Sequence, residues 1–434
     1  MTKRLKVCYT GGVKEYKKRF ADAAIKTAIE TFGAVVIEGA KAVGKSTSAL
    51  HAAASSVSLD RSPELAAVAQ TSPGVVLAGD VPRLVDEWQL APNIWNAVRH
   101  EADKRGVPGQ FILTGSATPT DDITRHSGAG RFGRIRLRTM SLAEMGHSTA
   151  QVNFRDLFSC GGKVGGFGGA DIPLIASLIV QGGWPFALGM TEKQVALYLR
   201  SYLEDTARLD VGSRTDRERV KALIRALARN LATETAMHNL MSETQITEAG
   251  LSEDAGVSAP TLRKYLDNLT RIFILEELPA WSTHIRSRVR QRVSPKWHFL
   301  DPSLAASALG INSARLLSEP KTLGFFFESL AIRDLRIYAE AMGGTISYYR
   351  DETGLEVDAV AELPDGKWAG FEIKLGGEQF VNEGAANLKK LRDKVADQRQ
   401  RDLMSLTVVT AGNTSYSRDD GVNVVALGHL TFAG

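Results

Sequence analysis

The sequence has little cysteine and no long hydrophobic run. Its 434 residues include two cysteines, Cys8 and Cys160, which lie far apart and outside any metal-ligand spacing. This excludes a disulfide framework and a thiolate metal site, and it is typical of the reducing cytoplasm. No apolar run reaches about 18 residues, the length of a candidate membrane span. The basic N-terminal stretch lacks the apolar core of a signal peptide, so we expect a cytoplasmic protein with no membrane partner.

The chain also lacks a strong net charge. It has 53 Lys and Arg against 49 Asp and Glu, a net charge of +4. Any affinity for nucleic acid must therefore come from local patches. The apolar fraction of 44% and the charged fraction of 24% are those of an ordinary globular protein,.

What the sequence does have is a phosphate-binding pattern. Gly39-Ala-Lys-Ala-Val-Gly44-Lys45-Ser46 matches G-x-x-x-x-G-K-[ST] and follows the apolar run 34–37. The glycines let backbone N–H groups surround a triphosphate, Lys45 reaches its β- and γ-phosphates, and the Ser46 hydroxyl binds Mg²⁺. The helix expected from Ser46, with Thr47 in its first turn, adds its N-terminal dipole. A plain glycine turn between strand and helix is the alternative.

An Asp-Glu pair follows at the end of a second apolar stretch, Arg83-Leu-Val-Asp86-Glu87. In an ATPase site Asp86 would hold Mg²⁺ through water, and Glu87 would polarise the attacking water. Pro82 interrupts what should be a central strand, where proline is poorly tolerated. Either the strand begins only at Arg83, or the site is partly degraded.

A third apolar stretch, 111–113, ends at Thr114. Ligands of doubly wound folds lie at the carboxyl ends of strands, so the Thr114 hydroxyl is expected near the γ-phosphate. A turn capped by Ser and Thr is the alternative. Further on, Arg131 or Arg134 could act as an arginine finger on the ATP of a neighbouring subunit in a homo-oligomer, or lie on a solvated face.

The ordered set of motifs resembles a known family. The motifs are Glu38–Ser46, Leu84–Pro92, Phe111–Ser116, Gly130-Arg131 with Arg138–Met145, and Gly182–Pro185. Together they resemble the prokaryotic AAA-type ATPases with a C-terminal domain of unknown function, the AAA_14/DUF4143 architecture. The resemblance covers nearly the whole chain. It implies an α/β P-loop fold and the binding of ATP with Mg²⁺.

The middle of the chain is expected to be helical. Apolar residues recur every three to four positions across 191–235, and the glycine-rich stretch 161–169 is typical of a flexible surface connector. Residues 246–269 have the pattern of a helix-turn-helix, with Ser258 as a helix cap and Pro260 in the first turn. Leu262, Leu266 and Leu269 form its expected buried stripe. Such a module contacts DNA, binds protein or is structural.

Arginine then recurs at every second position. The residues are Arg286, Arg288, Arg290 and Arg292. In a strand these side chains emerge from one face, which favours a nucleic-acid backbone as partner. An edge strand protected by charge is the alternative.

Acidic residues near the C-terminus have the order Glu…Asp…Glu-x-Lys. We expect Asp358, Glu372 and Lys374 on a β-hairpin and Glu328 on a helix. The three carboxylates would bind Mg²⁺, and Lys374 would orient or deprotonate a water. The order resembles that of the PD-(D/E)xK nuclease fold, and the family resemblance implies that the C-terminal domain is related to this fold. Surface charge is the alternative, and a metal cage can also hold nucleic acid without cutting it.

The two ends of the chain are each expected to form an α/β domain, and the middle is expected to be helical. The segments are a P-loop AAA-like ATPase domain at 1–150, a helical lid or connector at 151–235, a winged-helix-like domain at 236–300, and a restriction-endonuclease-like PD-(D/E)xK domain at 301–434. We expect an Mg²⁺-dependent ATPase coupled to a nucleic-acid-binding, nuclease-like domain. The alternative is a nucleotide-gated regulatory or interaction protein with an inactive nuclease fold. A GTPase is less favoured, because the sequence has no Asn-Lys-x-Asp motif.

Overall fold

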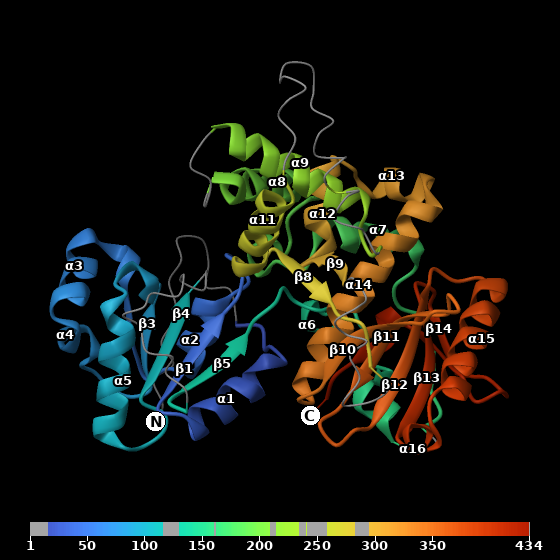
Figure 1. The fold of residues 1–434 in the computed structure, drawn as a ribbon, viewed down its shortest axis with the longest axis horizontal. Coiled ribbons are helices and arrows are strands. Elements are labelled where there is room, and N and C mark those ends of the chain that lie inside the picture. The colour runs from blue at the N-terminus through green and yellow to red at the C-terminus, as the bar shows by residue number, and fades with distance from the viewer. Residues whose placement is uncertain are drawn as a thin grey trace. The chain divides into compact units, whose positions relative to one another are not determined.

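The computed structural model describes residues 16–115, 130–159, 162–208, 214–233, 240, 258–282 and 295–433. Figure 1 shows these elements along the chain. The chain divides into two compact units. Described residues of the first are 16–37, 45–115 and 130–135, and those of the second come from 38–44 and 136–433. None of the helices in these ranges is long and apolar enough to cross a membrane.

The first unit is built around a five-stranded sheet of order β2-β3-β4-β1-β5. Strands β2, β3 and β4 run parallel. The strands are β1 (Ala34–Glu38), β2 (Ser55–Ser58), β3 (Arg83–Asp86), β4 (Phe111–Gly115) and β5 (Phe132–Arg136). The helices are α1 (Ala21–Thr31), α2 (Lys45–Ala52), α3 (Pro63–Thr71), α4 (Pro73–Leu77) and α5 (Asn93–Arg105). The continuous apolar runs of β1 and β4 are explained by their burial on both faces,.

Pro82 lies just outside the sheet. Strand β3 begins at Arg83, so the first of the two sequence interpretations is confirmed. The carbonyl oxygen of Pro82 accepts a hydrogen bond from the Ala54 N–H at 2.9 Å. The missing N–H of the proline is therefore not required by the strand.

The second unit contains a seven-stranded sheet of order β10-β11-β12-β13-β15-β14-β7. Strands β10, β11 and β12 are antiparallel, and β12, β13 and β15 are parallel. The strands are β7 (Gly165–Phe167), β10 (Thr345–Arg350), β11 (Glu356–Glu362), β12 (Trp368–Lys374), β13 (Leu403–Thr410), β14 (Thr414–Ser417) and β15 (Asn423–Ala426). Two further pairs are β6 (Val152–Asn153) with β16 (Leu430–Thr431), and β8 (Leu275–Leu278) with β9 (Lys296–Phe299).

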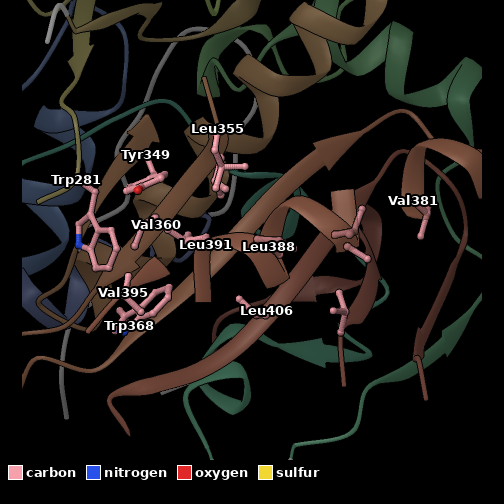
Figure 2. Packing of buried hydrophobic residues seen from close by; sticks show 14 of the residues in the cluster. Trp281, Tyr349, Leu355, Val360, Trp368, Val381, Leu388, Leu391, Val395 and Leu406 are labelled. Carbon is pink, nitrogen blue, oxygen red and sulfur yellow. The ribbon is translucent and has the colours of Figure 1, made fainter. Parts of the chain in front are cut away.

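Two long helices cover opposite faces of this sheet. A Cβ on Gly370 would lie 3.2 Å from Leu388 of α15 (Glu378–Lys394). The next residue, Phe371, points the other way and stacks on Phe154, which also contacts Tyr338 of α14 (Pro320–Ala341),. Figure 2 shows the core on the α15 face, which extends from Trp281 and Trp368 to Val381 and includes Leu388 and Leu391.

The glycine-rich stretch is not a connector, and that prediction is wrong. Residues 165–167 form β7, which pairs with β14 at the sheet edge. A Cβ on Gly166 would lie 2.5 Å from Gln151 Oε1 and 2.7 Å from His429 Nδ1. Close packing beneath the strand therefore favours glycine here. Because glycine has a low strand propensity, the sequence pattern did not indicate a strand.

The remaining helices of the second unit are α6 (Leu142–Met145), α7 (Ile172–Gln181), α8 (Glu192–Arg208), α9 (Arg214–Arg229), α11 (Ala259–Arg271), α12 (Pro302–Leu309), α13 (Ser313–Ser318) and α16 (Asp397–Arg401). Three of them, α7, α8 and α9, lie in the segment 151–235 that was expected to be helical. In α11, Ser258 is the N-cap, Pro260 lies in the first turn, and the leucine stripe is buried, as predicted. The first half of the proposed helix-turn-helix and Arg286, Arg288, Arg290 and Arg292 lie outside the described residues.

Candidate functional site

The phosphate-binding pattern lies between the end of β1 and the start of α2. Gly39 has φ +152° and Gly44 has φ +96°, values that favour glycine,. A Cβ on Gly39 would lie 2.2 Å from the carbonyl oxygen of Leu137. Lys45 begins α2 and is 5% exposed, with Ser46 and Thr47 following in the first turn. Backbone N–H groups of this turn have no acceptor within the helix, which suits an anion.

Asp86, the last residue of β3, accepts hydrogen bonds from hydroxyl groups of three elements. Ser46 Oγ donates to Oδ1 at 2.8 Å, and Thr114 Oγ1 donates to the same oxygen. Ser58 Oγ lies 3.3 Å from Oδ2, and its single hydroxyl hydrogen is shared with Asp60 Oδ1, which is closer at 2.6 Å. Thr114 and Ser58 both pair with Asp86 in the strand register, so neighbouring strands deliver them. The structure thus brings the predicted residues Ser46, Asp86 and Thr114 together and adds Ser58, which no motif marked.

Glu87 follows in the left-handed conformation, with φ 55° and ψ 43°. The Gln89 side-chain amide donates to Glu87 Oε2. Burial raises the pKa of Glu87, while the Gln89 hydrogen bond and the charge of Lys45 lower it in part. A carboxylate with a raised pKa is better suited to accept a proton from water. The Gln89 side-chain oxygen, Oε1, is buried and has no hydrogen-bond partner within the described ranges.

The residues around Asp86 fit an Mg²⁺ ion. The Ser46 hydroxyl and the Asp86 carboxylate are hard oxygen donors only 2.8 Å apart,. Ser46 would bind the ion directly and Asp86 through water. Ser58 and Thr114 hold the carboxylate in place by their hydrogen bonds.

The two candidate arginine fingers make contacts within their own unit. Arg131 Nε lies 2.9 Å from Asp103 Oδ1, and both side chains are partly exposed. The Arg134 guanidinium lies 5.3 Å from the centre of the Trp95 ring. A role for either arginine at the ATP of a neighbouring subunit stays a prediction.

A second cluster of charged groups lies at the β11–β12 hairpin. Lys374 Nζ is 3.3 Å from Asp358 Oδ2 and 2.5 Å from Glu372 Oε2. The Ile373 N–H also donates to Asp358 Oδ2, at 2.7 Å. Burial alone would raise the pKa of Asp358, but the charges of Lys374 and Lys296 outweigh it and lower that pKa. Burial and the neighbouring Asp358 raise the pKa of Glu372 well above its ordinary value.

The cluster includes a lysine that the sequence did not mark. Lys296 of β9 is 2% exposed, and its Nζ lies 3.2 Å from Glu328 Oε1 and 2.5 Å from Glu356 Oε1. Burial raises the pKa of Glu328 to about 7, although the charge of Lys296 opposes this shift. Lys296 comes four residues after Arg292 in sequence, where it is one more basic residue and carries no distinguishing signal.

The cluster as arranged does not fit a metal ion. Glu328, Asp358 and Glu372 each have an ammonium or backbone partner, and two lysines supply the positive charge. No three His, Cys, Asp or Glu side chains in the described part of the chain are placed to hold a metal ion. The three carboxylates predicted as ligands therefore all have basic partners within the chain.

Three family models match the chain. An AAA domain matches residues 31–146, a domain of unknown function called DUF8612 matches 172–315, and the DUF4143 domain of unknown function matches 323–430. The AAA and DUF4143 matches confirm the architecture that the motifs predicted.

Similar proteins extend over most of the chain. Uncharacterized proteins of Mycobacterium bovis and Mycobacterium tuberculosis are each 25% identical over 428 residues, which is 96% of this chain and 85% of the relative. Among solved structures, the Walker-type ATPase of Pyrococcus abyssi is similar with a TM-score of 0.40 and 11% identity, over 66% of this chain and 94% of that one. The Aeropyrum pernix ORC2 protein, solved as ADPNP-ADP complexes, has a TM-score of 0.33 and 12% identity, over 69% and 92%.

Proposed function

We propose that this chain, which carries an AAA domain at residues 31–146 and a DUF4143 domain at residues 323–430, binds ATP with Mg²⁺ and hydrolyses it. The observation that carries this proposal is the meeting of Ser46, Asp86 and Thr114 beside the phosphate loop. A loop for phosphate, a carboxylate for a metal and a second carboxylate for water are the parts that phosphoryl transfer to water requires.

Each part has a separate task. Backbone N–H groups of the loop and the Lys45 ammonium hold the β- and γ-phosphates. A bound Mg²⁺ supplies charge neutralisation of these phosphates. Glu87 accepts the proton of the attacking water as the water oxygen bonds to the γ-phosphorus and the bond to the leaving ADP oxygen breaks. Gln89 keeps the Glu87 carboxylate in position through its hydrogen bond.

Two variants test this division of tasks. We expect Lys45→Ala to lose ATP binding, measured with a fluorescent ATP analogue. Glu87→Gln should keep binding and lose at least about 100-fold in hydrolysis, the size of a general-base contribution. Unchanged binding in Lys45→Ala would show that the loop is not the nucleotide site. Full hydrolysis by Glu87→Gln would remove Glu87 from the mechanism.

For the C-terminal domain we propose the role without cleavage, in which nucleotide state regulates an interaction. The supporting observation is that Lys296 and Lys374 form ion pairs with the carboxylates that a nuclease would use for metal. Nucleic acid remains a proposed partner, through the arginine repeat. The test is incubation of plasmid and branched DNA with Mg²⁺ or Mn²⁺. Cleavage by the wild type that disappears in Lys374→Ala would establish the nuclease instead.

A further inference from the structure

Residues 38–44 of the phosphate loop belong to the second unit. Their backbone contacts a short segment of that same unit, residues 136–142, which we call the strap. The Leu137 N–H donates to the Glu38 carbonyl oxygen at 2.8 Å. The Leu137 carbonyl oxygen occupies the space where a Cβ on Gly39 would stand. A shift of the strap at Leu137 must therefore move the first residues of the loop.

A buried ion network holds the first half of the strap. Arg138 is 7% exposed, and its Nε lies 3.0 Å from Glu276 Oε1 of β8. Its Nη1 pairs with Glu340 of α14. Glu276 also pairs with Arg136 at 2.7 Å and with Arg336 of α14 at 2.5 Å. Breaking one partner from such a network leaves charge buried without compensation, so the network resists displacement.

Backbone hydrogen bonds hold the second half of the strap. The Met140 N–H donates to the Gly183 carbonyl oxygen at 2.7 Å, and a Cβ on Gly183 would lie 2.0 Å from the Met140 carbonyl oxygen. The Leu142 N–H donates to Asp334 Oδ2 of α14 at 2.9 Å. Asp334 is paired in turn with Arg333 at 2.7 Å. The strap is thus bound to α14 at both ends.

We propose that Arg138, Glu276 and Glu340 are positioning residues of the nucleotide site. They fix the strap, the strap fixes Glu38 and Gly39, and the affinity for ATP therefore depends on the arrangement of β8 and α14. Because coupling between two sites is reciprocal, bound nucleotide must equally affect β8 and α14. The inference rests on the proposed ATP binding and identifies two elements that respond to it: β8, within the DUF8612 match, and α14, at the start of the DUF4143 match.

The variant best suited to the test is Glu340→Gln. Glu276 is buried among three arginines, and its loss endangers folding,. Glu340 is 44% exposed, and Glu340→Gln removes one of the two carboxylates on Arg138. We expect the Kd for ATP to rise at least about fivefold, the lower end of coupling effects, with kcat unchanged. Glu340→Asp should restore part of the affinity.

The matched control is Glu362→Gln. It removes the carboxylate that lies 2.7 Å from Arg399 in the same unit and does not contact the strap. We expect its ATP affinity to equal that of the wild type even if its Tm falls. Equal ATP affinity of Glu340→Gln and Glu362→Gln would overturn the proposal. Failure of the wild type to bind ATP would instead overturn the proposed function.

Hydrogen exchange of the wild type tests the reverse direction. Saturating ATP should slow amide exchange in peptides that cover the strap and β8, as well as in peptides of the phosphate loop. In Glu340→Gln the slowing at β8 should shrink while that at the loop persists at saturation. Protection confined to the loop in the wild type would contradict the proposal.

Discussion

Ser58 and Asp86 stand side by side at the ends of neighbouring parallel strands, with the Ser58 hydroxyl 3.3 Å from Asp86 Oδ2. Of the three hydroxyls on this carboxylate, Ser58 is the one that lies in no phosphate-site motif. We expect Ser58→Ala to reduce ATP hydrolysis by about two- to tenfold, since one hydrogen bond contributes about 0.5–1.5 kcal/mol. The steady-state rate measures this. Ser56→Ala, an exposed change on the same strand, should have no effect, and equal losses in both would show that Ser58 acts only through the strand.

Gly39→Ala should abolish nucleotide binding. The substitution brings a Cβ to 2.2 Å from a backbone oxygen at a φ of +152°, and neither atom belongs to a flexible side chain,. Binding of a fluorescent ATP analogue measures the loss. Gly74→Ala is the control, because nothing lies within 4 Å of its Cβ and it is in α4. A Gly39→Ala protein with normal affinity would show that the loop does not need its contact with Leu137.

Lys296→Met should destabilise the chain by about 3–5 kcal/mol, because it leaves Glu328 without its buried partner,. It should also create a site that free cations can fill. Mn²⁺ is expected to raise the Tm of the variant and leave that of the wild type unchanged, as followed by thermal unfolding with and without the metal. Lys367→Met removes an exposed lysine that pairs with Asp365 and serves as the control. A rise in the Tm of the wild type on addition of Mn²⁺ would contradict the interpretation that Lys296 keeps metal out of this cluster.

The stability of the wild type should depend on pH through Glu328, whose pKa burial raises from 4.5 to about 7. A carboxyl with a higher pKa in the folded chain stabilises folding when protonated. This contribution is complete below about pH 4.5 and is lost as the pH rises through about 7. Relative to Glu328→Gln, the wild type should lose up to about 3 kcal/mol of unfolding free energy over that range. Urea unfolding at pH 4.5 and 8 measures this, with the exposed Glu352→Gln as control. A constant difference between wild type and Glu328→Gln would rule out this titration.

The sequence predicted the parts of the nucleotide site that depend on local pattern. The phosphate loop has its own motif, and Asp86 and Thr114 each end an apolar run, which places them at one edge of a parallel sheet. Ser58 and Gln89 could not be found in this way. Ser58 depends on the position of β2 in the sheet, and Gln89 depends on the left-handed turn at Glu87.

The charged clusters were less predictable for a different reason. Glu372 and Lys374 were expected together because a strand has a period of two. Lys296 and Glu276 belong to a separate strand pair, and only tertiary packing brings them to their partners. The glycines of β7 were misread because a glycine required by packing and a glycine in a linker look the same in sequence.

Strand β7 also bears on how the C-terminal sheet can be isolated and how it forms. The strand leaves the ribosome long before its neighbour β14, so the sheet cannot be completed until almost the whole chain has been made. A fragment that begins at residue 301 would leave the edge of β14 open to other chains. We expect this fragment to aggregate through that edge. A fragment that begins before Val152 would retain β7, which covers β14 at the edge of the sheet.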